Sequence, residues 1–216
     1  MRRLAIPIFL VATVIAVTGH RLAAQEVVDR IVARVENDVI LLSDIRVLSR
    51  YQQFLDGKSE TDAQILDRLI DQWIVRTEAE VSRTPRPSEE DIDRSLGSLK
   101  NSFVSEQEYE ARKKQAALSD QDIRAMAATQ LYLSYYLDSR FRPGVQIDPK
   151  AIEDFYQNTV LPRAKARGQD PPTLEAARDS IQEALVQNGI NEQAERWLKE
   201  SRLRLHIEKL LEEGAR

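Results

Sequence analysis

The stretch that decides the fold is VVDRIVARVENDVILLSDI, residues Val27–Ile45. Apolar and polar side chains alternate from Ile31 to Val35, as they do in a strand with one buried face. Asn37-Asp38 interrupts this run, and both residue types tolerate the positive φ that a two-residue hairpin turn requires. The apolar residues 39–42 supply a return strand. Ser43 then predicts a helix start, because its hydroxyl can accept a free backbone N–H.

An isolated two-stranded hairpin is only marginally stable in water, so this one must pack against other elements. Nearly all of the sequence that follows is patterned as helix. The predicted helix starts carry N-capping side chains, at Thr61, Ser88, Ser105, Ser119, Asp148, Thr173 and Asn191. Gly57 and Gly189 predict helix ends, and Pro162–Pro172 predicts a polar linker. The fold class is therefore mainly α, with a small N-terminal β-hairpin.

The C-terminal region permits two interpretations. Leu203–Ile207 alternates apolar and basic residues, which predicts a short strand that would complete the opening hairpin. The next residues, 208–213, are helix formers and favour a helical end instead. Pro143-Gly144 predicts a turn, and it divides the chain into an N-terminal module, 25–145, and a helical segment, 146–216. We expect both to close a single domain.

Residues 1–24 are patterned as a secretory signal peptide, with Arg2 and Arg3 before an apolar run and Ala23-Ala24 at the cleavage site. The apolar run, Leu4–Val17, is shorter than the ~20 residues that span a bilayer. We therefore expect cleavage and export to the periplasm, with no membrane span in the mature chain. A failure of cleavage would instead leave the protein anchored in the membrane.

The mature chain is acidic. Cleavage removes Arg2, Arg3 and Arg21 and no acid, so the 31 basic side chains become 28 against 35 acidic ones, a net charge of −7. This balance argues against a nucleic-acid partner, which requires a basic surface. We expect no such partner.

Residue types that carry covalent chemistry are scarce. The chain has no cysteine, and His206 is the one histidine that remains after cleavage. Glu89-Glu90-Asp91 and Asp120/Asp122 lie at predicted helix N-termini, where acids are favourable without any catalytic role. The seven glycines are scattered and form no phosphate-binding loop. The sequence predicts no catalytic residue, no metal site and no cofactor.

Aromatic side chains give the only candidate binding residues. They gather on two predicted helices, at Tyr51, Phe54, Tyr132, Tyr135, Tyr136 and Phe141. Core packing explains such residues in most proteins. They would also suit an apolar groove for extended or unfolded peptides, because tyrosine offers both a ring and a hydrogen-bonding tip. The sequence leaves both interpretations open.

Several segments together resemble a known family. The hairpin stretch Val27–Ile45 and the segment Ile65–Ile74 resemble the N-terminal domain of SurA-type periplasmic chaperones, a module also found in the PpiD and PrsA foldases. Ser88–Leu99 resembles a later helix of that family, and Asp148–Asn158 resembles the stretch before its isomerase domains. Glu195–Ile207 resembles its C-terminal helix and closing strand. Compared with the family pattern, this chain has one extra residue between Val35 and Asn37.

The resemblance implies a chaperone without the family's isomerase. In SurA-like proteins, parvulin domains of about 90–100 residues precede the closing segment, but here only Thr159–Pro172 occupies that place. The histidines of a parvulin site are also absent. We therefore expect no enzyme, but an ATP-independent holdase for unfolded or outer-membrane protein clients. A residual prolyl isomerase, an adaptor with one fixed partner and a homodimer are the alternatives.

Overall fold

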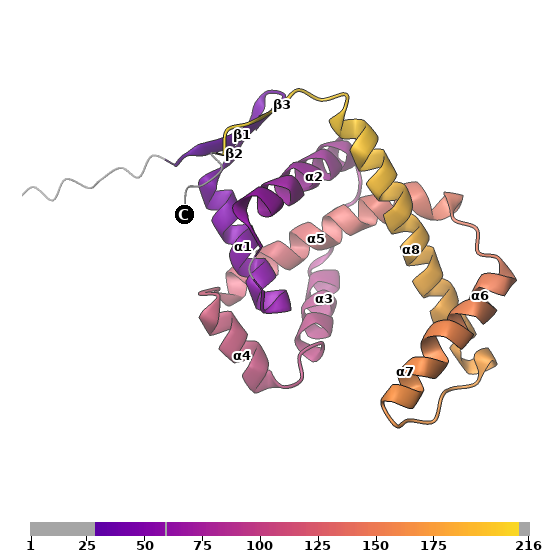
Figure 1. The fold of residues 1–216 in the computed structure, drawn as a ribbon. Helices are drawn as coiled ribbons and strands as arrows, with labels where there is room; N and C mark the ends of the chain where they lie inside the picture. Colours follow the sequence, from indigo (N-terminus) through magenta and orange to yellow (C-terminus); the bar gives the residue numbers. More distant parts are fainter. Residues whose placement is uncertain (1–28, 59, 212–216) are drawn as a thin grey trace, which may run out of the picture.

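The computed structural model describes residues 29–58 and 60–211. Helices make up most of this part of the chain, and a small three-stranded antiparallel sheet joins its two ends (Figure 1). The mainly α fold with an N-terminal hairpin is therefore confirmed. The predicted signal peptide, 1–24, lies outside the described residues.

The predicted hairpin forms, with its turn one residue earlier than expected. Strand β1 (Ile31–Val35) pairs with β2 (Asp38–Leu41), and Val35 lies opposite Asp38. Glu36 and Asn37 therefore make the turn, not Asn37-Asp38. Glu36 adopts the positive φ of 53°, and its N–H donates to the carbonyl oxygen of His206 at 2.9 Å. This contact with a distant segment stabilises a backbone conformation that glutamate rarely adopts.

The C-terminal strand also forms, but it begins later than predicted. Strand β3 (Ile207–Lys209) pairs antiparallel with β1, so the order in the sheet is β2-β1-β3. Of the expected Leu203–Ile207, only the last residue lies in the strand, and the residues before it make the turn out of the last helix. The helix expected for 208–213 is not formed at 208–211, because β1 takes up the backbone of Glu208 and Lys209.

Helix α1 (Leu42–Asp56) follows β2 directly and begins one residue before Ser43. Ser43 is therefore inside the first turn, and the capping contact comes from Asp44, whose carboxylate accepts the N–H of Leu41 at 2.8 Å. The predicted end is confirmed, because Gly57 adopts the left-handed conformation with φ 67°.

The next helices begin where their capping residues predict. They are α2 (Asp62–Val81), α3 (Glu89–Asn101), α4 (Glu106–Gln115) and α5 (Asp120–Phe141). The hydroxyls of Thr61, Ser88, Ser105 and Ser119 each accept the backbone N–H three residues later. Asp91 and Asp122 return the contact to Ser88 and Ser119, so these acids are capping groups.

A helical arm follows the turn η1 (Arg142–Gly144). Helix α6 (Pro149–Phe155) continues through a π-helical turn, η2 (Tyr156–Val160), into α7 (Leu161–Ala166). The linker predicted from Pro162 is therefore helical up to Ala166. In a regular α-helix, the ring of a proline clashes with the carbonyl group four residues earlier. The π turn before Pro162 is wider than an α-helical turn, so it leaves more room for the proline ring.

The last helix, α8 (Leu174–Arg202), is continuous, so the predicted end at Gly189 and the restart at Asn191 are wrong. Gly189 is a packing residue instead. A Cβ atom built on it would lie 2.7 Å from Cγ1 of Val145 in the loop after η1, so only glycine lets this loop approach the helix.

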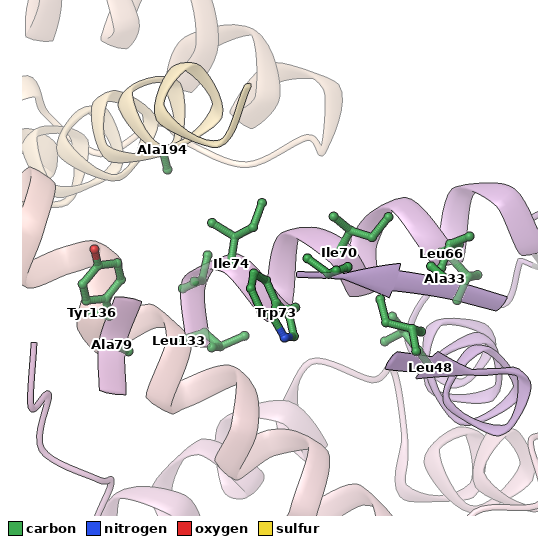
Figure 2. Packing of buried hydrophobic residues seen from close by; sticks show 14 of the residues in the cluster. Ala33, Leu48, Leu66, Ile70, Trp73, Ile74, Ala79, Leu133, Tyr136 and Ala194 are labelled. Carbon is green, nitrogen blue, oxygen red and sulfur yellow. The ribbon is translucent and has the colours of Figure 1, made fainter. Parts of the chain in front are cut away.

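Apolar side chains from both ends of the chain share the main core (Figure 2). Ala33 of the sheet, Leu48 of α1 and Ile70 of α2 are joined there by Tyr136 of α5 and Ala194 of α8. The first half of α8 packs instead against α6 and η2, around a separate small cluster of Ile152, Ala177 and Ile181. Among the described residues, no helix is long and apolar enough to cross a membrane.

Candidate functional site

Five of the six candidate aromatics are buried. On α1, Phe54 has no exposed surface and Tyr51 has 3%, and the ring of Phe54 meets that of Tyr109 edge-on at 5.4 Å. Phe103 completes this cluster, with its ring 5.2 Å from that of Phe54. Tyr109 and Phe103 come from α4 and the loop before it, a polar region whose sequence gave little sign of a core.

Three candidates on α5 join the main core. Tyr132, Tyr136 and Phe141 are between 2% and 9% exposed. The ring centroids of Tyr136 and Phe141 lie 6.0 and 5.8 Å from that of Trp197 on α8. Tyr136 and Phe141 thus hold α5 against α8, and all three side chains have little surface to offer a peptide.

Tyr135 is the remaining candidate, and it is only half-buried. It lines an open cleft of about 510 Å³ between α5 and α8. The lining side chains are Ser134, Tyr135, Leu137, Asp138, Gln187, Ile190 and Asn191. We call this the α5–α8 cleft. Its volume is in the range of protein sites that hold small ligands or a few side chains.

The α5–α8 cleft combines apolar and hydrogen-bonding groups. The half-buried Leu137 and Tyr135 supply apolar surface, whereas Ile190 is only 3% exposed and adds little. Gln187 and Asn191 are exposed on α8. A side-chain amide both donates and accepts hydrogen bonds, so it can pair with the N–H and C=O groups of an extended peptide. Such a surface can accept many sequences, because the backbone is common to all of them.

The charges around the cleft are largely paired. Asp138 accepts a hydrogen bond from Nε of Arg142 at 2.8 Å, and Arg142 donates two more to Glu183 on α8. Burial raises the pKa of Tyr135, and a hydrogen bond with Asp91 of α3 raises it further. Its hydroxyl therefore stays protonated and neutral at neutral pH. Because Arg142 is shared by two carboxylates, these three charged groups leave a net charge of −1 beside the cleft.

Comparisons with known proteins add no assignment: neither a scan of family models nor a search of curated proteins gives a match. The SurA-type resemblance therefore stays a prediction from the sequence.

His206 directly precedes the first residue of β3 and does not line the cleft. Its side chain is exposed, and its backbone N–H donates to Oε1 of Glu36 at 2.7 Å. Within residues 29–58 and 60–211, no three side chains of the metal-binding types gather into a site.

Sequence reasoning missed most of the cleft. Gln187, Ile190 and Asn191 lie on both sides of Gly189, where the sequence predicted a helix end. Their partners on α5 are about 50 residues earlier in the chain, and no local pattern reports that pairing. Tyr135 alone was found, because a run of aromatics on one helix can be recognised without tertiary information.

Proposed function

We propose that the protein is an exported, ATP-independent holdase that binds unfolded polypeptides in the α5–α8 cleft. The observation that carries the proposal is the cleft itself, an open apolar surface with exposed amides and paired charges. Binding there would bury client side chains and leave the client backbone paired with amides. Such contacts give weak and promiscuous affinity, because ordering the client offsets most of the gain from burial.

The cellular setting is part of the same proposal. The signal-like residues 1–24 and the resemblance of the hairpin to SurA-type chaperones support a periplasmic location and outer-membrane-type clients. Neither feature depends on the geometry of the cleft. We expect the mature chain to suppress aggregation without nucleotide, because the proposed holdase mechanism uses binding alone.

A light-scattering assay tests the proposal. An unfolding client protein should aggregate less when the mature chain is added at an equal molar amount, with or without ATP. A photo-crosslinking residue placed at Gln187 should capture the client. The same residue placed at Glu192, which is exposed on the same helix and does not line the cleft, should capture far less.

Three results would redirect the proposal. No suppression of aggregation at a stoichiometric amount would contradict a holdase. Catalysed isomerisation in a protease-coupled proline peptide assay would identify the enzyme alternative. A stable dimer in size-exclusion chromatography with light scattering, together with crosslinks between Gln187 and a second copy, would assign the cleft to self-association.

A further inference from the structure

A second concave site lies between α2, α5 and the C-terminal end of α8. It encloses about 330 Å³. Trp73, Ile74 and Trp197 are only 3–8% exposed and line it with the small part of their surface that is not buried. Arg140, Arg204 and Glu78 contribute charge. We call it the tryptophan pocket. Figure 2 shows Trp73 and Ile74 on neighbouring positions of α2.

Two guanidinium groups border this pocket without an acidic partner. Neither Arg140 nor Arg204 forms a salt bridge within the described part of the chain, although 18 such contacts are present there. Arg140 donates one hydrogen bond, to the hydroxyl of Tyr136 at 3.0 Å, and Arg204 makes one long contact of 3.4 Å with Oγ of Ser201. A guanidinium has five N–H donors, so most of these remain available.

The guanidinium of Arg140 is held in place by aromatic rings. Its Cζ atom lies 5.0 Å from the ring centroid of Trp197, 5.5 Å from that of Phe141 and 5.8 Å from that of Tyr136. Cation–π contacts restrict the orientation of an arginine through the face of its guanidinium, and the N–H donors at its edge can still form hydrogen bonds. A fixed donor loses less entropy when an anion binds.

The balance of charge in the pocket is positive. Glu78 is the one carboxylate among the lining residues, and it hydrogen-bonds with the hydroxyl of Tyr136. Two cations against one acid leave a net positive site on a chain whose net charge is −4. The sign of the pocket is thus opposite to that of the whole protein, and an anion is the complementary ligand.

We propose that the tryptophan pocket binds an organic carboxylate with an aromatic or branched apolar body. Arg140 and Arg204 would donate to the carboxylate, and Trp73, Ile74 and Trp197 would cover the body. The ligand chemistry is shared by the C-terminus of a peptide and by a free aryl or alkyl carboxylate. The inference goes beyond the proposed function, since the pocket could bind this ligand whether or not the α5–α8 cleft holds a client.

The two tryptophans make a direct test possible. They are the only tryptophans in the chain, and both line this pocket, so intrinsic fluorescence reports on it. The mature chain is titrated with N-acetyl-phenylalanine and with its amide, then with the pentapeptide Ala-Ala-Ala-Ala-Phe carrying a free or an amidated C-terminus. We expect saturable changes with both acids and at least about tenfold weaker binding of both amides, since hydrogen bonds to a charged group contribute about 1.5–3 kcal/mol.

Variants separate the pocket from general charge effects. Arg204 lies beyond the end of α8. Arg204→Gln should weaken binding of the acids about tenfold, and Arg140→Gln should weaken it further. Arg76→Gln removes an exposed cation from another face of α2 and should leave binding unchanged. Circular dichroism confirms that each variant is folded.

The outcomes are distinguishable. Tighter binding of the pentapeptide acid identifies a peptide C-terminus as the source, and tighter binding of N-acetyl-phenylalanine identifies a free carboxylate. Equal binding of acids and amides, no saturable change with either acid, or an Arg76→Gln effect as large as that of Arg204→Gln would overturn the proposal. None of these results depends on the aggregation assay, so failure here leaves the holdase proposal intact.

Discussion

The indole N–H of Trp73 donates a 2.7 Å hydrogen bond to Oδ2 of Asp38, and this contact joins the core helix α2 to the first residue of β2. Trp73 is 8% exposed and Asp38 is exposed, so the hydrogen bond between them is partly buried. An unsatisfied buried donor costs about 1–3 kcal/mol.

We therefore expect Asp38→Ala to lower the free energy of unfolding by about 1–3 kcal/mol in urea titrations. Asp38→Asn keeps an oxygen acceptor in the same place and should lose less. In a Trp73→Phe background, which has no donor, Asp38→Ala should add little. An equal loss in both backgrounds would show that the hydrogen bond does not explain the effect.

Gly189 and Gly97 are both inside helices, and the structure predicts opposite effects of alanine at the two positions. Alanine favours a helix interior by about 1 kcal/mol over glycine. A Cβ at Gly97 in α3 meets nothing within 4 Å, so Gly97→Ala should stabilise the protein by up to about that amount.

At Gly189 the Cβ would lie 2.7 Å from Val145, and overpacking of this kind costs about 1–3 kcal/mol. Gly189→Ala should therefore destabilise the protein in thermal or urea unfolding. Adding Val145→Ala should recover part of the loss by removing the clashing methyl groups. A stabilised Gly189→Ala variant would mean that the loop carrying Val145 moves away freely.

These residues also show what could be predicted from the sequence. Ser88 and Ser119 were found as N-caps because capping depends on residues within one turn of each other. The sequence predicts a helix end at Gly189, but a glycine is needed there because any Cβ atom would clash with Val145, 44 positions earlier. The turn at Glu36 was misplaced for the same kind of reason, because its contact with His206 is set by β3. Burial of Tyr136 depends on α8 in the same way.

The ion pair between Arg142 and Glu183 should make stability depend on acid pH. Arg142 donates two hydrogen bonds, of 2.7 and 2.9 Å, and together with a weaker contribution from a hydrogen bond of Gln187 this lowers the pKa of Glu183 from 4.5 to about 2. A lowered pKa in the folded state means that the contribution is fully present above pH 4.5. It is lost as the pH falls from 4.5 toward 2.

Urea midpoints at pH 6, 4.5 and 3 should therefore show a difference between the native chain and Glu183→Gln that shrinks as the pH falls. Glu175→Gln is a suitable control, because Glu175 is exposed on the same helix and its nearest arginine contact, with Arg178, is 3.5 Å. A difference that stays constant across this range would rule out the protonation of Glu183 as its cause.

Filling the α5–α8 cleft should reduce client binding without unfolding the protein. Asn191 is exposed and lines the cleft, so Asn191→Trp would occupy the space that a client side chain needs. We expect weaker suppression of aggregation by this variant. Glu192→Trp adds the same bulk at a neighbouring exposed position outside the cleft and should behave as the native chain does. Equal losses in both variants would point to a general surface effect.

The pairing of β1 with β3 has a consequence for synthesis of the chain. Arg34 and Glu208 are 174 residues apart in the chain, yet they form an ion pair of 2.8 Å across these strands. Closing a loop of that length costs about 4–5 kcal/mol of chain entropy by the logarithmic rule. A ribosome releases the N-terminal strand first. Until residue 209 has followed, β1 has one open edge and could pair with another chain. At that stage the unfinished chain is itself an unfolded polypeptide, the kind of molecule that the proposed holdase would bind.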